Sequence, residues 1–474
     1  MSFYLGIDIG TTAIKGIVIS STGEICATHY VRRSEISRME LHPDDPANVW
    51  SNFKIVIQSL RASAPEVFAN VSAIAISGVV PNICLLNARD EVHSPLLRYS
   101  DRRAYNIEVE LDSARKSSAW QNEVLSKLIW LKANSILPQK EPLKIFSPHT
   151  WITYKLTGKY VMDRVSAIEH GCVFDISNQC WDEGLLRSYS VDYIEWPDVT
   201  SPFAVSGRID EGIARELGLS DSVKVAVGGP DFLASLLGSG AREAGDTMIY
   251  LGTYHCGCEL AYSLADIDNG NLERHAIKWI STIPQVGPQC EIAAELITGL
   301  AGNAAWSQLE LLAMSEPTSG NGTMFVPCVQ LLESTISTKP LSGLFFTGSR
   351  LEKSGLARAV FESTAIGIAV DLKRHQVSLK GKRVYISGGG CRSRVQRETL
   401  STVLQIPVTF IAAAEDGLGS ALIAMRALDP VRFLTLDIED VWKPLVVLPK
   451  QSTDSLVLKE AFYEGVIRSK LDDL

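Results

Sequence analysis

The chain has 474 residues, of which 46% are hydrophobic and 21% charged, as is ordinary for globular proteins, and its length predicts two or three domains. A net charge of −9 argues against a nucleic-acid partner, which would need a basic face. The sequence has no apolar run long enough to cross a membrane, no basic segment of a signal peptide, and nine cysteines without a disulfide or zinc pattern. We therefore expect a cytoplasmic protein with neither nucleic-acid nor membrane partners.

The opening segment carries the most informative pattern of the chain. Residues 4–9 are apolar on both faces apart from Asp8, which predicts a buried strand with a carboxylate near its end. The turn Gly10-Thr11-Thr12 follows, and residues 14–19 predict a second strand. Such a turn offers backbone N–H groups and hydroxyls to a nucleotide phosphate, and the adjacent carboxylate suits Mg²⁺. The alternative is an ordinary hairpin in which Asp8 caps the turn.

Strands and helices alternate along the rest of the chain, which predicts an α/β fold. In the first half we expect a helix from Pro46 through Leu60, a strand from Val71 to Ser77, helical segments over 100–135, a strand from Lys224 to Gly229 and a helix over 232–240. In the second half we expect strands over 248–253, 384–387 and 407–412, and helices over 392–405 and 416–428.

One segment of the second half repeats the theme of the opening. Met248–Thr253 is a strand that runs into Gly252-Thr253, and more strand-like sequence follows it. This weak internal repeat predicts two similar halves. A Gly- and charge-rich stretch marks the break between them, and we place the domains at 1–241 and 242–474.

Asp231 is a second carboxylate in an informative position. Gly228-Gly-Pro-Asp231 stands at a strand-to-helix junction, where Pro230 suits the first helical turn and Asp231 lies at or near the helix N-terminus. Taken alone, such an aspartate is explained by helix capping. Beside Asp8 and two Gly-Thr turns, it predicts a base that accepts the proton of an alcohol during phosphoryl transfer.

Further glycines are candidates for a nucleotide site. Gly252-Thr253 is a second candidate phosphate turn, with a plain turn as the alternative. Gly388-Gly389-Gly390 stands before a helix and would let a nucleotide approach the backbone, with loop flexibility as the alternative. Gly417 and Gly419 open another helix, where close helix packing is the alternative. The sequence contains neither Gly-x-Gly-x-x-Gly nor a Walker motif at these places, so the common nucleotide motifs are unsupported.

In their order along the chain, these motifs resemble the FGGY family of carbohydrate kinases in the actin-like ATPase superfamily, with the xylulokinase-like branch as the nearest general pattern. The similar segments are Leu5–Thr12, Ala75–Gly78, Tyr99–Arg103, Tyr154–Gly158, Gly228–Asp231, Leu251–Thr253, Arg358–Ser363, Gly388–Gly390 and Gly417–Ala421. The resemblance implies two actin-like (ribonuclease H-like) domains with mixed sheets flanked by helices and a cleft between them. Residues 1–241 would form the acceptor side, with the first phosphate motif and the base, and 242–474 the nucleotide side.

The resemblance also implies a reaction, the transfer of the γ-phosphoryl group of ATP to a hydroxyl of a small sugar or polyol. Asp231 would be the general base and Asp8 would position Mg²⁺. The nucleotide would contact Gly10, Thr11, Thr12, Lys15, Gly252, Thr253, Gly388, Gly389, Gly390, Ser393 and Gly419. The acceptor would contact Asn82, Asp101, Arg102 and Asp231. Relatives are often dimers, which makes a homodimer an open expectation.

Three segments depart from the family pattern. Where many relatives carry polar residues such as Gln-Met-His after Gly78, this chain has Val79-Val-Pro-Asn82, with Asn82 as its single polar side chain. The second phosphate motif continues into Tyr254-His255, and Met324–Glu333 replaces a Gly-Glu-Arg element. We expect retained ATP machinery and a rebuilt acceptor pocket, with a ketose such as a pentulose, a polyol or a related small hydroxylated chain as acceptor. The alternative is an ATP-binding actin-fold regulator or sensor without sugar turnover.

Overall fold

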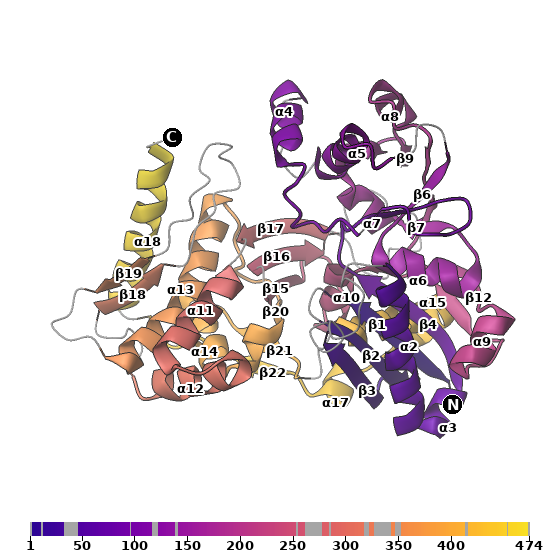
Figure 1. Ribbon diagram of the computed structural model, residues 1–474. Coiled ribbons are helices and arrows are strands. Elements are labelled where there is room, and N and C mark those ends of the chain that lie inside the picture. The colour runs from indigo at the N-terminus through magenta and orange to yellow at the C-terminus, as the bar shows by residue number, and fades with distance from the viewer. Residues whose placement is uncertain are drawn as a thin grey trace. The chain divides into compact units, whose positions relative to one another are not determined.

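The protein is described by a computed structural model that divides into two compact units (Figure 1). Unit 1 comprises Met1–Gly238 and Glu415–Trp442, and unit 2 comprises Ser239–Ala414 and Lys443–Leu474. The described residues are 2–10, 13–32, 46–94, 96–115, 122–137, 141–252, 255–260, 277–283, 286–316, 322–326, 343–346, 352–412, 416–452 and 454–472. Within these ranges no helix is long and apolar enough to span a lipid bilayer.

Unit 1 contains most of the secondary structure. Its strands are β1 (Phe3–Ile9), β2 (Ala13–Ser20), β3 (Ile25–Arg32), β4 (Val71–Gly78), β5 (Cys84–Leu86), β6 (Leu143–Phe146), β7 (Val161–Asp163), β8 (Phe174–Asp175), β9 (Cys180–Trp181), β10 (Ile194–Glu195), β11 (Asp198–Thr200), β12 (Val205–Arg208), β13 (Lys224–Ala226) and β14 (Gly229–Pro230). Its helices are α2 (Pro46–Ser63), α3 (Pro65–Ala69), α4 (Tyr105–Arg115), α5 (Glu123–Ala133), α6 (Pro148–Thr157), α7 (Arg164–Glu169), α8 (Glu183–Ser188), α9 (Glu211–Leu217), α10 (Asp231–Gly238), α15 (Asp416–Leu428), α16 (Pro430–Leu434) and α17 (Ile438–Trp442), with a 3₁₀ turn at Gly171–Val173.

Unit 2 is built from fewer elements. Its strands are β15 (Thr247–Leu251), β16 (His255–Leu260), β17 (Ile277–Ile283), β18 (Thr323–Val326), β19 (Gly343–Phe346), β20 (Val384–Ser387), β21 (Val408–Phe410) and β22 (Leu445–Val447). Its helices are α11 (Val286–Thr298), α12 (Gly302–Met314), α13 (Lys353–Arg374), α14 (Arg394–Leu404) and α18 (Asp454–Asp472), with a 3₁₀ turn at Gly389–Arg392.

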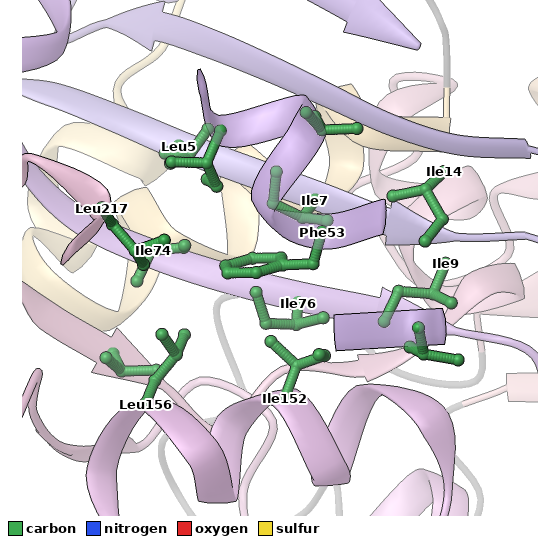
Figure 2. Packing of buried hydrophobic residues seen from close by; sticks show 14 of the residues in the cluster. Leu5, Ile7, Ile9, Ile14, Phe53, Ile74, Ile76, Ile152, Leu156 and Leu217 are labelled. Carbon is green, nitrogen blue, oxygen red and sulfur yellow. The ribbon is translucent and has the colours of Figure 1, made fainter. Parts of the chain in front are cut away.

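The main sheet of unit 1 is mixed, with the order β12-β13-β4-β1-β2-β3, and β14 also pairs with β4. Strands β1, β4, β13 and β14 are parallel, while β2, β3 and β12 run antiparallel to their neighbours. Alternate residues of β1 face opposite sides of the sheet. Leu5, Ile7 and Ile9 pack toward Phe53 of α2 and Ile152 of α6, as Figure 2 shows.

The other face of β1 is covered by α15, which comes from the far end of the chain. A side-chain carbon built on Gly6 would lie 2.1 Å from the backbone nitrogen of Ala421, so β1 and α15 are in contact through their backbones. A carbon built on Gly419 would lie 1.7 Å from the carbonyl oxygen of Ala234 in α10. Close packing, the alternative explanation of Gly419, is therefore present in the structure, and its contact with a nucleotide stays a prediction.

The strand expected over 224–229 is interrupted, and this expectation is wrong in detail. In the parallel pairing with β4, Val225 faces Ile74 but Gly229 faces Ser77, so one extra residue separates β13 from β14. Gly228 has φ = +84°, and a carbon built on it would lie 2.1 Å from the carbonyl oxygen of Ile76. The insertion is a bulge, which redirects the chain just before Asp231.

The predicted first residues of two helices also need correction, one at this junction and one in unit 2. Pro230 ends strand β14, opposite Gly78, and helix α10 begins one residue later at Asp231. Helix α14 begins at Arg394 because Ser393 caps it, its hydroxyl accepting a hydrogen bond from the backbone of Gln396.

A second, smaller core lies in unit 1 around β5, β6 and β10, which form a three-stranded sheet. Leu125, Leu128 and Leu131, which lie in the segment predicted to be helical, are fully buried on α5 and belong to this core. They pack with residues from β5 and β6, including Leu85 and Ile145.

The sheet of unit 2 has the order β17-β16-β15-β20-β21-β22 and repeats the plan of unit 1. In each unit three antiparallel strands are followed in space by two strands parallel to the first and then by an antiparallel edge strand. The two similar halves predicted from the sequence are therefore present in the sheet topology.

A substitution at the contact of α15 with α10 tests this packing directly. We expect Gly419→Ala to lower the free energy of unfolding by about 3 kcal/mol, because the new methyl group collides with backbone atoms. Gly465→Ala in α18 is the matched control, since a carbon built there meets nothing within 4 Å and should stabilise the helix by about 0.5–1 kcal/mol. Urea denaturation measures both, and equal stability of Gly419→Ala and wild type would contradict this packing.

Candidate active site

Asp8 lies at the edge where the parallel strands of unit 1 end. It is 1% exposed, and in the sheet register it stands beside Ser77 of β4. The Ser77 hydroxyl donates a 2.7 Å hydrogen bond to Asp8 Oδ1. A carbon built on Gly10 would lie 3.3 Å from Asp8 Oδ2, so the second carboxylate oxygen adjoins the turn after β1. The buried acid predicted from the sequence is thus held by a side chain on the neighbouring strand.

Asp231 reaches the same edge from the other side of β4. Gly229 faces Ser77, which in turn faces Asp8, so Asp8 and Gly229 are separated by two strand spacings, about 10 Å. Asp231 follows two residues later as the first residue of α10, and its Oδ1 accepts a 2.8 Å hydrogen bond from the backbone N–H of Phe232. The structure therefore brings both predicted carboxylates to one end of one sheet.

The predicted phosphate turn of unit 1 is described in part. Gly10 donates a 3.0 Å backbone hydrogen bond to Ala13, which closes the turn between β1 and β2. Lys15 stands opposite Asp8 in the antiparallel register and is half-buried. Opposed residues of an antiparallel pair share a face, so Lys15 is on the face of the sheet that carries Asp8. Thr11 and Thr12 lie outside the described residues.

The segment expected to contact the acceptor is mostly buried. Val79, Pro81 and Asn82 are buried after Gly78, and Val80 is half-buried. The Asn82 Oδ1 atom accepts a 2.7 Å hydrogen bond from the backbone N–H of Tyr99. The single polar side chain of this segment is thus engaged in holding the neighbouring loop.

Asp101 has its own partner, which sequence analysis missed. Arg103 donates hydrogen bonds from Nε and Nη2 to the Asp101 carboxylate and stacks over the ring of Trp130 at 4.9 Å. Burial alone would raise the pKa of Asp101, but the hydrogen bonds and charge of Arg103 outweigh it and hold the pKa below its usual value. Arg102, the residue predicted to contact the acceptor, is exposed and lies over Tyr105.

A buried polar cluster lies beside this edge, and sequence analysis did not predict its contacts. His149 and Asp163, both fully buried, approach to 3.2 Å between Nε2 and Oδ2, and Asp163 Oδ1 accepts a hydrogen bond from the backbone of Ser166. A carbon built on Gly78 would lie 3.3 Å from His149 Cβ, and one on Gly229 would lie 3.7 Å from Asp163 Cγ. The pair thus supports the two backbone positions that precede the 79–82 segment and Asp231.

In unit 2 the predicted nucleotide glycines also gather at strand ends. Tyr250 of β15 faces Ser387 of β20 in a parallel register, so Gly252 and Gly388 follow neighbouring strands at one edge of the sheet. Gly388 has φ = +94°, and a carbon built on it would lie 2.5 Å from the carbonyl oxygen of Leu251, which explains the first glycine of the triplet. Thr253 lies outside the described residues.

The remaining glycines of the triplet leave backbone accessible. Gly389 is exposed, with nothing within 4 Å of a carbon built on it, while Gly390 is half-buried against Leu251. Ser393 caps α14 and donates a 3.0 Å hydrogen bond to Glu310, so its hydroxyl already has two structural partners. His255, which departs from the family pattern, is buried, and burial lowers its pKa to about 4.

The Arg358–Ser363 motif, which resembles a family segment, lies on α13 of unit 2 and has a structural role. Glu362 of α13 is fully buried and accepts hydrogen bonds from Arg358 at 3.3 Å and from Lys459 of α18 at 2.6 Å. Arg358 also donates to the hydroxyl of Thr399 in α14. The Arg-Ala-x-x-Glu pattern therefore connects three helices.

The Met324–Glu333 segment is described only as far as Val326.

The sheet edge of unit 1 that carries Asp8 and Asp231 has carboxylate oxygens, which are ligands of the kind that Mg²⁺ takes. In the described part of the chain, no three His, Cys, Asp or Glu residues come together as a metal-binding group. Asp8 has one oxygen held by Ser77 and the other beside Gly10, in the predicted phosphate turn. Protein-bound Mg²⁺ commonly takes one or two carboxylates, substrate phosphates and water, which is the set that Asp8 could join.

Two α/β units of one topology, with Asp8 and Asp231 at the strand ends of the first, are the arrangement that the sequence predicted for a two-domain phosphotransferase. Residues 3–238 match the N-terminal domain of the FGGY family of carbohydrate kinases, and residues 272–428 match the C-terminal domain of that family. The chain belongs to the FGGY family of carbohydrate kinases. Membership implies ATP as the phosphoryl donor and a hydroxylated sugar or polyol as the acceptor.

Individual relatives agree with this assignment. The chain is 24% identical to xylulose kinase of Escherichia coli (strain K12) over 454 residues, which is 91% of each chain. It is 24% identical to glycerol kinase of Acinetobacter baylyi (strain ATCC 33305 / BD413 / ADP1) over 442 residues, 86% of each chain. The crystal structure of xylulose kinase from Rhodospirillum rubrum superposes with a TM-score of 0.76 at 21% identity over 99% of both chains. The predicted fold of two mixed α/β domains is confirmed.

We expect the stability of unit 1 to depend on pH through His170, which is fully buried and hydrogen-bonded to Ser166 beside the His149–Asp163 pair. Burial lowers the pKa of His170 to about 4, although its Nδ1–H donates a 2.7 Å hydrogen bond to the carbonyl of Ser166. The unfolded chain therefore binds a proton there between about pH 6.5 and 4 that the folded chain does not, so stability falls as pH falls.

We expect His170→Asn to remove about 2 kcal/mol of the stability difference between pH 7 and pH 5, because asparagine can still donate to Ser166 but does not titrate. Tryptophan fluorescence can follow urea unfolding, since Trp181 and Trp196 adjoin His170. An unchanged pH dependence in the variant would contradict this assignment.

Proposed function

We propose that the chain transfers the γ-phosphoryl group of ATP to a hydroxyl of a small sugar or polyol, with a ketose such as a pentulose favoured. The observation that carries the proposal is that Asp8 and Asp231 lie at the same edge of one sheet, on the two sides of β4. Similarity to a xylulose kinase and a glycerol kinase over most of their lengths supports a small hydroxylated acceptor. We place the reaction in the cytoplasm, because the cysteines of the described residues are free thiols.

Asp231 acts as the general base. It accepts the proton of the acceptor hydroxyl while the acceptor oxygen attacks the γ-phosphorus, and the bond from that phosphorus to the oxygen shared with the β-phosphate breaks. A carboxylate in the first turn of α10 is stabilised in its charged form by the helix dipole. A positioned base of this kind raises the reaction rate by a factor of about 10² to 10⁴.

Asp8 and the glycine turns serve the nucleotide. Asp8 would hold Mg²⁺ through Oδ2 together with water and phosphate oxygens, and a bound Mg²⁺ neutralises the charge on those oxygens. Turns Gly10–Thr12 and Gly252-Thr253 would offer N–H groups to phosphates. The open backbone at Gly389 would admit the nucleoside part.

Acceptor selection is the part of the site that departs from the family pattern. Val79 and Pro81 are apolar and buried, and Asn82 holds Tyr99, so this segment offers few side-chain hydrogen bonds to a sugar. A pocket without such partners discriminates weakly between related acceptors, by roughly 10- to 200-fold. We therefore infer that the enzyme accepts several small hydroxylated compounds.

An ATP-binding sensor without turnover is the alternative that this apolar segment favours. A sensor needs the nucleotide side alone, whereas the geometry keeps a second carboxylate at the helix N-terminus on the same edge as Asp8. Binding ATP requires no base, so the placement of Asp231 supports the kinase.

Replacing the base separates chemistry from binding. We expect Asp231→Asn to lower kcat at least about 100-fold while the Kd for ATP, measured by calorimetry, changes less than about threefold. Asp221→Asn, at an exposed residue of the same unit, should behave as wild type. Normal turnover in Asp231→Asn would show that Asp231 is not the general base.

The acceptor is found by measuring ADP release with a panel of ketoses, polyols, sugar acids and small diols. We expect several of them to stimulate release, with ketoses highest, and we expect this stimulation to vanish in Asp231→Asn. A panel in which no compound stimulates release in wild type would favour the sensor.

A further inference from the structure

A chain of buried hydroxyls connects the C-terminal part of the sequence to Asp8. Ser420 on α15 and Ser77 on β4 lie 2.6 Å apart between their Oγ atoms, and Ser77 lies 2.7 Å from Asp8 Oδ1. The exposed fractions are 0% for both serines and 1% for Asp8. All three residues belong to unit 1, although 343 residues separate the two serines.

The direction of this chain follows from counting protons. A serine hydroxyl has one proton to donate, and an ionised carboxylate has none. The Ser77 proton is directed to Asp8 Oδ1, so the proton between the two serines belongs to Ser420. The bonds therefore run from Ser420 to Ser77 to Asp8, and each bond polarises and strengthens the next.

The two oxygens of Asp8 consequently have different surroundings. Oδ1 is held from inside the unit by Ser77, whereas Oδ2 adjoins Gly10 at the phosphate turn. A carboxylate fixed at one oxygen presents the other in one orientation, and Mg²⁺ demands near-ideal octahedral geometry from its ligands.

We propose that Ser77 and Ser420 are positioning residues that hold Asp8 in the orientation in which its Oδ2 atom meets Mg²⁺. The inference rests on the proposed function, because it takes Asp8 as the magnesium carboxylate. It adds that two fully buried serines set how well the metal is bound. Ser420 contacts Ser77, which contacts Asp8, so we expect the removal of Ser420 to have little further effect on the metal once Ser77 is gone.

The test is a calorimetric titration of Mg²⁺ into the full-length protein with saturating ADP, which needs no turnover. We expect Ser77→Ala to raise the Mg²⁺ concentration at half-saturation about tenfold and Ser420→Ala about threefold, because the first loses a hydrogen bond to a charged group and the second a neutral one. The double variant should match Ser77→Ala, since coupled residues are not additive. ADP binding without metal should stay as in wild type.

Ser94→Ala is the matched control for the loss of a buried serine. Ser94 is 1% exposed, and its Oγ accepts a 3.0 Å hydrogen bond from the backbone of Leu85, in the smaller core of unit 1. We expect it to lose stability like Ser77→Ala but to keep the wild-type Mg²⁺ titration. If Ser77→Ala does not fold, Ser420→Ala carries the test alone, because alanine suits a helix.

The outcomes separate this proposal from the proposed function. If Asp8→Ala weakens Mg²⁺ binding while both serine variants titrate as Ser94→Ala does, the positioning role is overturned and the role of Asp8 stands. Additive effects of the two serine variants would also overturn it. If Asp8→Ala itself titrates as wild type, the magnesium role of Asp8 fails first.

Discussion

The backbone contact between α15 and β1 is the constraint on which the site of unit 1 depends. A side chain at Gly6 would collide with α15, and one at Gly419 would collide with α10. Because both positions lack side chains, the helix lies close enough to the sheet for the short hydroxyl of Ser420 to reach Ser77. The orientation of Asp8 is thus set by packing of apolar surfaces as much as by its own hydrogen bond.

The repeated sheet topology shows which part of the site belongs to the fold and which to the chemistry. Asp8 faces Ser77 in unit 1, and Tyr250 faces Ser387 at the same place in unit 2, each two residues before a glycine turn. The strand register and the glycine two residues later are common to both halves, but the first half has an acid at this position and the second a tyrosine. The fold provides two corresponding strand ends, and the residues on them differ: Asp8 stands opposite Lys15 in unit 1, and Tyr250 stands opposite Cys256 in unit 2.

Sequence patterns were sufficient for the parts of the site that lie next to one another in the chain. The apolar run interrupted by Asp8, the glycine turns and the strand-to-helix junction at Asp231 each combine a local preference with an unusual residue. Their meeting at one edge follows from the parallel strands, whose carboxyl ends share a side of the sheet. That is why both carboxylates could be named before their arrangement was known.

Other parts could not be read from the chain because they depend on contacts between distant segments. Ser77 and Ser420 are common residues in unremarkable surroundings, and their pairing exists only after α15 packs on the sheet. The partner of Asn82 is a backbone group on another loop, and the bulge at Gly228 appears only in the register with β4. A glycine in a helix can suggest close packing, as Gly419 did, but neither it nor a serine identifies the distant residue that it contacts.

The return of residues 415–442 to unit 1 also has a consequence for how the protein is made. Helix α15 is almost entirely buried, so β1 cannot complete its surroundings until the ribosome has synthesised nearly the whole chain. At about 5–20 residues per second, roughly 10–40 seconds pass between the synthesis of α10 and that of α17. During that interval the nascent first unit exposes the sheet face that α15 later covers, and Ser77, which holds Asp8 on that face, lacks its contact with Ser420.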